Sequence, residues 1–285
     1  MARAWVEAAV GPGSRVERAT PLAGANTSAL HGLTVRDRRG TRRDLVLRRY
    51  VLGDWLAREP DLAEREAEVL VILERSPLPT PELIAADTVG DEAGAPAVLM
   101  TLLPGTPSAV TDLPDVLVVL AEVLPALQTT SVPPAAGLRT YRSYAAPDVR
   151  PPAWSNLASV WARAIDLHDA WSPPASGVFI HRDYHPGNVL IVDGEVTGLV
   201  DWANASRGAP GVDVGHCRLN LAGLLGLDAA DRFRDAWLSA SGETAYDPTF
   251  DLLAAVGMLP ELAVVLRPGA EQVDALVARA VAEIG

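Results

Sequence analysis

The chain has 285 residues, of which 49% are hydrophobic, and its 24 basic and 36 acidic residues give a formal net charge of -12 at pH 7. This length allows a sizeable core, and the acidic balance argues against a nucleic-acid partner, because phosphate backbones require a basic surface. No apolar run approaches the roughly 20 residues of a membrane span, and a single cysteine excludes an intramolecular disulfide, so we expect a cytoplasmic protein without a membrane partner.

The first hundred residues predict a β-rich region that contains one long helix. Strands are expected at Val16–Leu22, Ser28–Asp37 and Asp44–Tyr50. A periodic apolar side, with Asp61 as a fitting N-cap, predicts a helix at Asp61–Arg75. The run PAVLMTLL, at Pro96–Leu103, predicts a buried strand.

The rest of the chain is predicted to be mostly helical. Helices are expected at Leu113–Leu127, Ser155–Trp171, Asp213–Leu225, Ala229–Ser241, Thr249–Leu266 and Glu271–Ile284. The proline pairs between some of them do not have the composition of disordered linkers. Length and composition favour two lobes that close on a cleft over two independent domains.

One segment between these helices, residues 181–202, places polar groups at spacings that suit phosphoryl transfer. Its sequence is HRDYHPGNVLIVDGEVTGLVDW, and it begins with a polar loop from His181 to Asn188. The Asp193-Gly194 pair, a strong hairpin signal, then joins two apolar strands. Because a hairpin folds back on itself, we expect Asn188 at its start to lie close to Asp201 at its end.

The residue types in this segment indicate a particular chemistry. The amide oxygen of Asn188 and the carboxylate of Asp201 are hard ligands that suit Mg²⁺. Asp183, five residues before Asn188, is placed to accept a proton from an attacking hydroxyl. Each residue alone has an ordinary structural explanation, but their order, spacing and hairpin context agree.

HRDYHPGNVL followed by VDW resembles the aminoglycoside phosphotransferase and choline kinase-like family of small-molecule kinases. The resemblance implies an α+β, two-lobed protein kinase-like fold, with a β-rich N-lobe containing one main helix and a mostly helical C-lobe. It places the N-lobe at residues 1–103, ending in the hinge, and the C-lobe at 104–285. It implies that Asp183 is the catalytic base and that Asn188 and Asp201 hold Mg²⁺, with ATP as the phosphate donor.

The same resemblance implies two supports for the catalytic loop and a phosphate-covering loop in the N-lobe. His181 and Asp213 match supporting positions, Asp213 through a carboxylate that braces the loop; an N-cap for the next helix is the alternative for Asp213. The loop PLAGANTSAL would contact ATP phosphates through Asn26, Thr27 and Ser28. With a single glycine it also fits a plain turn.

LVLRRY, at residues 45–50, resembles the kinase strand that carries a phosphate-pairing lysine. This chain has no lysine at all, so the cation must be Arg48 or Arg49, and the alignment favours Arg48. Two exposed arginines on an edge strand are the alternative. The resemblance makes Glu66 the ion-pair partner of Arg48 and assigns adenine contacts to the backbone of Thr101 and Leu103.

The acceptor is expected to be a small molecule. Only 11 residues separate Asp201 from Asp213, too few for the peptide-docking segment of a protein kinase. Members of the family phosphorylate aminoglycosides, macrolides, choline, homoserine and other small alcohols. The negative net charge favours an aminoglycoside or another cationic alcohol, because acidic clefts concentrate amines.

Two other functions fit parts of the pattern. His181, Asp183 and His185 alternate along the chain and could hold a transition metal in a hydrolase. The missing lysine and the glycine-poor loop also fit a catalytically silent nucleotide-binding protein.

Overall fold

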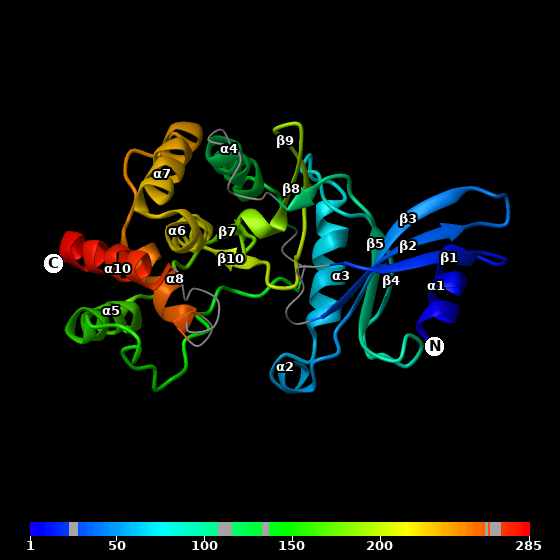
Figure 1. Cartoon of the computed structure of the whole chain (residues 1–285), viewed down its shortest axis with the longest axis horizontal. Helices are drawn as coiled ribbons and strands as arrows, with labels where there is room; N and C mark the ends of the chain where they lie inside the picture. Colours follow the sequence, from blue (N-terminus) through cyan, green and yellow to red (C-terminus); the bar gives the residue numbers. More distant parts are fainter. Residues whose placement is uncertain (23–27, 108–115, 133–136, 260–261, 263–268) are drawn as a thin grey trace. The chain divides into compact units, whose positions relative to one another are not determined.

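The computed structural model describes residues 1–22, 28–107, 116–132, 137–259, 262 and 269–285, and they form two compact units (Figure 1). Unit 1 consists of Met1–Gly105, Val132–Leu138 and Thr197–Ala205. Unit 2 consists of Thr106–Ser131, Arg139–Val196 and Ser206–Gly285. The lobes expected at 1–103 and 104–285 are each continuous, whereas unit 1 gathers three stretches of chain. The functional division into lobes therefore stays a prediction.

Unit 1 contains a five-stranded antiparallel sheet in the order β1-β2-β3-β5-β4. Its strands are β1 (Arg15–Pro21), β2 (Ala29–Arg36), β3 (Arg42–Arg49), β4 (Leu83–Asp87) and β5 (Ala97–Thr101). Four of them were expected, with ends that differ by at most two residues, and β4 was not. Because β3 lies between β2 and β5, the alternative of two arginines on an edge strand is wrong.

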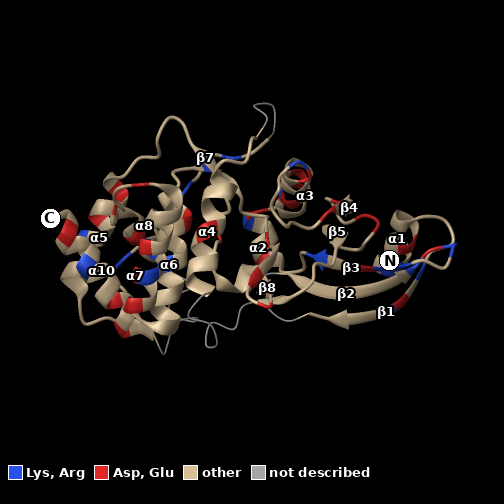
Figure 2. Ribbon diagram, turned by 90° about the horizontal axis from the view of Figure 1, so that it is seen from above, with Lys and Arg blue, Asp and Glu red and all other residues tan. Residues whose placement is uncertain are grey.

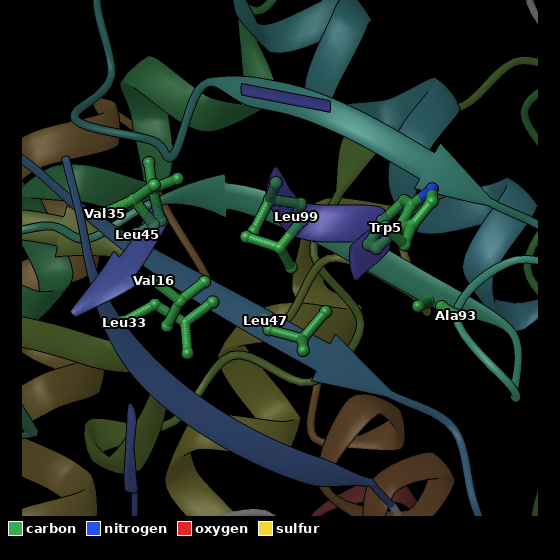
Figure 3. Packing of buried hydrophobic residues seen from close by; sticks show 10 residues of the cluster. Trp5, Val16, Leu33, Val35, Leu45, Leu47, Ala93 and Leu99 are labelled. Atoms are coloured by element: carbon green, nitrogen blue, oxygen red, sulfur yellow. The ribbon is translucent and has the colours of Figure 1, made fainter. Parts of the chain in front are cut away.

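The helices of unit 1 cover opposite sides of β3. Leu45 and Leu47 face a core that includes Trp5 of α1 (Ala2–Val10), as Figure 3 shows. Arg48, one position further along the strand, points to the other face, towards α3 (Leu62–Leu73). Burying each large apolar side chain of this core contributes about 1.5–3 kcal/mol. The sequence analysis missed α1 and also α2 (Gly53–Arg58).

Unit 2 is built mainly from helices. They are α4 (Val116–Gln128), α5 (Ala158–Ala170), α6 (Gly211–Leu225), α7 (Leu227–Ser241), α8 (Thr249–Gly257) and α10 (Ala270–Ile284). Short strand pairs join β7 (Val178–Ile180) to β10 (Ser206–Gly208) and β6 (Thr106–Pro107) to β8 (Val189–Val192). The expected hairpin is formed by β8 and β9 (Glu195–Leu199), and β9 belongs to unit 1 from Thr197 onwards. The sheet of the N-terminal region and the helices of the C-terminal region confirm the predicted α+β class.

Helix α6 lies at the centre of unit 2 and packs closely against α8. A Cβ atom at Gly211 would lie 2.1 Å from the ring of Phe250, and one at Gly215 would lie 2.2 Å from the Phe250 carbonyl oxygen. Real Cβ atoms do not approach so closely, so these two glycines, one turn apart, allow the helices to touch. This contact fixes the position of α6.

A buried arginine ties the same helices together. Arg218 of α6 makes two hydrogen bonds, of 2.9 and 3.0 Å, to the carboxylate of Asp251 in α8. It also donates to the carbonyl oxygen of Ala230 in α7 at 2.8 Å. Tyr246 completes the group with a 2.7 Å hydrogen bond to Asp251. Acidic residues are otherwise spread over helices of both units, as on α3 and α7 in Figure 2.

Several predicted helix boundaries differ from the observed ones by two residues or more; α5 begins at Ala158 instead of Ser155, and α7 begins at Leu227 instead of Ala229. Helix α6 begins at Gly211 after Pro210, so Asp213 lies inside the first turn and is not the N-cap. Proline fits the start of a helix because it lacks the N–H that would have no partner there. Helix α8 ends at Gly257, where a residue of low helix propensity occurs, and part of the predicted continuation to Leu266 lies outside the described residues. None of the described helices has the length and apolar character needed to cross a membrane.

Candidate active site

The first group of candidate residues lies in unit 1 and is centred on Arg48. Its Nη1 atom lies 2.8 Å from Oε1 of Glu66 and 2.6 Å from Oδ1 of Asp201. Its Nε donates to Oγ of Ser28 at 3.0 Å. Tyr50 donates to the second oxygen of Glu66 at 2.8 Å. Arg48 and Glu66 are 4% and 1% exposed, so this is a buried network with a hydrogen bond to each oxygen of Glu66.

The charges of this network stabilise one another. Burial alone would lower the pKa of Arg48, but the carboxylates of Asp201 and Glu66 outweigh it and raise that pKa well above its usual range. Burial and Glu66 raise the pKa of Tyr50 well above its usual range, so its hydroxyl keeps its proton and remains a donor. The cation therefore stays charged at any physiological pH.

Local structure explains why Arg48, and not Arg49, enters this network. Successive side chains of a strand point to opposite faces, so Arg49 lies on the face of Leu47 and away from Glu66. The hydroxyl of Ser28 reaches Arg48 from the residue just before β2. Asn26 and Thr27, also expected to contact phosphate, lie outside the described residues.

The residues expected to contact adenine lie at the end of β5. The N–H of Thr101 donates to the carbonyl oxygen of Glu82 at 3.0 Å, and its hydroxyl accepts from the N–H of Glu82 at 2.9 Å. The Thr101 N–H is thus already used by a backbone hydrogen bond and is not the group expected to meet adenine. Leu103 follows in the segment after the strand, and both adenine contacts stay predictions.

The second group lies in unit 2, in the loop from His181 to Asn188. The buried carboxylate of Asp213 accepts hydrogen bonds from the backbone N–H of His181 at 2.8 Å and of Arg182 at 2.6 Å. Arg182 has a φ of 72°, a left-handed conformation that is unfavourable for a side chain of this size. Its guanidinium lies 3.6 Å from the centre of the Tyr144 ring, which helps to hold this turn. Asp213 thus contacts the loop that it was expected to brace, and its supporting role stays a prediction.

Asp183 follows this strained turn, and hydrogen bonds from three directions hold it. The side-chain amide of Asn188 donates to the Asp183 carbonyl oxygen at 2.9 Å and to Oδ2 at 3.2 Å. The Nε2 atom of His216 lies 3.1 Å from Oδ1. The backbone N–H of Asp183 donates to Nδ1 of His181 at 3.3 Å.

These contacts decide the ionisation of Asp183. Burial would raise the pKa of its carboxyl group, but the hydrogen bond and the charge of His216 outweigh burial and hold that pKa below its usual range. The carboxylate is therefore ionised at neutral pH, as a general base must be.

His216 was missed by the sequence analysis. It lies on α6 three residues after Asp213, and side chains at this spacing share a face of a helix. Since Asp213 was already expected to touch the loop, its helical neighbour His216 was a candidate for the same contact. The three-residue spacing between Asp213 and His216 could therefore have predicted that His216 contacts the loop.

The two expected Mg²⁺ ligands fit the ion in their chemistry. Both hydrogen bonds that Asn188 gives to Asp183 use its amide nitrogen, so its oxygen is left as a ligand. Asp201 supplies a carboxylate that is paired with Arg48. Asn188 belongs to unit 2 and Asp201 to unit 1, so the convergence of the two stays a prediction.

The geometry does not favour the metal-dependent hydrolase. Nδ1 of His181 accepts the Asp183 N–H, and Nδ1 of His185 accepts the Gly187 N–H at 3.1 Å. In the part of the chain that is described, no group of three or more His, Cys, Asp or Glu side chains is arranged to hold a metal ion.

Comparisons with known proteins agree with the geometry. A sequence model of the phosphotransferase enzyme family matches residues 27–252, which is more than half of the chain. No curated protein matches the sequence.

Solved structures show the same fold at low sequence identity. A thermostable mutant of the aminoglycoside phosphotransferase APH(4)-Ia, in a ternary complex with AMP-PNP and hygromycin B, is 18% identical with a TM-score of 0.63, covering 99% of this chain and 97% of that one. A putative aminoglycoside phosphotransferase from Ralstonia eutropha JMP134 is 16% identical with a TM-score of 0.59, covering 99% and 95%. The macrolide 2'-phosphotransferase MphH from Brachybacterium faecium is 17% identical with a TM-score of 0.58, covering 98% and 97%.

Proposed function

Because the chain belongs to the phosphotransferase enzyme family and is a small-molecule kinase, we propose that it transfers the terminal phosphate of ATP to a hydroxyl group of its substrate, with Mg²⁺ as cofactor. The observation that carries the proposal is the state of Asp183. Its carboxylate receives one hydrogen bond from Asn188 and one from His216, on different oxygens. A carboxylate held in this way is oriented to accept the proton of an attacking hydroxyl.

The reaction uses Asp183 as the general base. The acceptor oxygen forms a bond to the terminal phosphorus of ATP while the bond from phosphorus to the oxygen of ADP breaks. The proton of the acceptor hydroxyl passes to the Asp183 carboxylate. A general base in this position contributes about 10²–10⁴-fold to the rate.

The buried network of unit 1 would bind the phosphates. Arg48 is permanently charged and is held by Glu66, so its guanidinium is oriented before ATP arrives. Ser28 would add a hydroxyl from the phosphate-covering loop, together with Asn26 and Thr27. Asn188 and Asp201 would hold Mg²⁺, which neutralises phosphate charge when it is bound.

An aminoglycoside or another cationic alcohol is the favoured acceptor. The support is the negative net charge of the chain and the relatives of similar fold, one of which holds hygromycin B. Macrolides are the next class to test, since another relative is a macrolide 2'-phosphotransferase. Activity on either class would make the protein an antibiotic-modifying enzyme.

The test is a screen for ADP release with ATP and Mg²⁺ against aminoglycosides, macrolides and small amino alcohols. At least one acceptor should give phosphorylated product detectable by mass spectrometry. An Asp183→Asn variant should bind ATP as the wild type does and release ADP about 10²–10⁴-fold more slowly. Full turnover by this variant would remove Asp183 from the mechanism, and ATP binding without transfer to any acceptor would favour the catalytically silent alternative.

A further inference from the structure

Helix α6 contacts the catalytic loop at two levels. Asp213 in its first turn accepts two backbone N–H groups of the loop, and His216 three residues later reaches the side chain of Asp183. The close packing of Gly211 and Gly215 against Phe250 of α8 fixes the helix. The same helix, α6, therefore holds both the backbone of the loop and the side chain of Asp183.

The contact between His216 and Asp183 is direct. His216 is 7% exposed, and its Nε2 atom lies 3.1 Å from Oδ1 of Asp183. An ionised carboxylate only accepts hydrogen bonds, so Nε2 must carry the proton. Asn188 donates to the other oxygen, and the two donors hold the carboxylate from both sides.

The other nearby imidazole does not make the same contact. The Nε2 atom of His185 lies 3.7 Å from Oδ1 of Asp183, beyond hydrogen-bond distance. Its Nδ1 is used by the backbone N–H of Gly187. His216 is thus the histidine that holds the base.

We propose that His216 is a positioning residue for the general base: its Nε2–H fixes Oδ1 of Asp183, so that the carboxylate meets the acceptor hydroxyl in one orientation. This inference rests on the proposed phosphotransfer. It gives His216 no contact with substrate and no part in the proton transfer itself. Without the donor, only Asn188 still holds the carboxylate of Asp183, which can then shift, and a displacement of about 1 Å at a reacting group lowers a rate by about 100-fold.

Three variants separate this role from simple space filling. His216→Phe fills the site but has no donor, and it should lower kcat by about 10- to 100-fold with the KM for ATP unchanged. His216→Gln keeps an N–H donor and should recover part of the loss. His168→Phe is the matched control, because His168 also belongs to unit 2 and contacts a carboxylate, that of Asp169, outside the site; its kcat should equal that of the wild type.

A second measurement does not depend on turnover. In protein labelled with ¹⁵N-histidine, the Nε2–H proton of His216 should resonate downfield, and Asp183→Ala should abolish that shift. An unchanged kcat in His216→Phe, beside an active wild type, overturns the inference and leaves the proposed function intact. Absence of transfer by the wild type overturns the proposed function, and a His216 signal insensitive to Asp183→Ala overturns the contact itself.

Discussion

The Nη1 atom of Arg48 lies 2.6 Å from Oδ1 of Asp201, although 153 positions separate the two residues in the sequence. The same nitrogen holds Glu66, so a single guanidinium joins β3, α3 and the segment after β9. The cation expected to bind ATP is thereby paired with a carboxylate expected to bind Mg²⁺. Nucleotide affinity and the integrity of unit 1 should therefore depend on the same side chain.

Replacing Arg48 by alanine should weaken ATP binding by about 10- to 100-fold, because it removes a charge-assisted contact to phosphate worth about 1.5–3 kcal/mol. It should also lower the free energy of unfolding by about 3–5 kcal/mol, since Glu66 would stay buried without its partner. Isothermal titration with ATP and denaturant unfolding measure the two effects. Arg49→Ala is the control on the opposite face of β3, and a comparable loss of affinity there would contradict the assignment.

Replacing Arg48 by lysine tests why arginine occurs here. A lysine keeps the positive charge and the ion pair with Glu66, but one ammonium cannot also reproduce the planar contact of Nε with Ser28. We expect Arg48→Lys to keep most of the stability of the wild type and to lose affinity for ATP by less than Arg48→Ala does. An affinity equal to that of Arg48→Ala would show that the guanidinium geometry, and not its charge, is required.

The low pKa of Asp183 predicts the acid side of the pH profile. Its folded-state pKa is depressed, so the carboxylate stabilises the fold above its unfolded pKa of about 3.9, and that stabilisation is lost as pH falls through the folded value. Asp183 therefore stays ionised throughout the range in which most proteins are assayed. The kcat/KM of the enzyme should show no acid limb from this base above about pH 5. An acid limb of kcat/KM near pH 6 would contradict a depressed pKa of Asp183.

The sequence predicted those parts of the site that depend on local pattern. Alignment with the kinase strand favoured Arg48 over Arg49, and the Asp193-Gly194 turn predicted the hairpin that follows the loop from His181 to Asn188. The same patterns located most helices and strands to within a few residues. The spacing of apolar residues and the residue types that form turns are properties of short stretches of chain, so they can be recognised in a single sequence.

The contacts that the sequence did not predict depend on packing between distant segments. His216 was missed although its spacing from Asp213 indicated the same face of α6, because the sequence alone did not show that the Asp183 side chain lies within its reach. The pairing of Arg48 with Asp201 was missed because Asp201 was considered only as a metal ligand. Helix α1 was missed because nine residues are few for a helix that forms without tertiary contacts, although its buried residues Trp5 and Val6 pack on the sheet.

The buried pair of Arg218 and Asp251 should be a main source of stability in unit 2. Asp251→Ala leaves a guanidinium that is 1% exposed without its bidentate partner, and we expect a loss of about 3–5 kcal/mol in the free energy of unfolding. Asp235→Ala removes an exposed carboxylate that pairs with Arg234, and it should change stability by less than about 0.5 kcal/mol. Urea unfolding of both variants measures the two losses. Equal losses would mean that the buried pair stabilises the fold no more than the exposed pair of Asp235 and Arg234 does.

The close approach of α6 and α8 should couple packing to turnover. In Gly215→Ala the new methyl group would lie 2.2 Å from the carbonyl oxygen of Phe250, so the helices must separate, at a cost of about 1–3 kcal/mol. Because α6 also carries Asp213 and His216, its shift should displace Asp183 and lower kcat in protein that is still folded. Gly53→Ala is the control, since nothing lies within 4 Å of a Cβ atom there, and its stability and kcat should match the wild type. A Gly215→Ala protein that is destabilised but keeps full kcat would show that the loop does not depend on the position of α6.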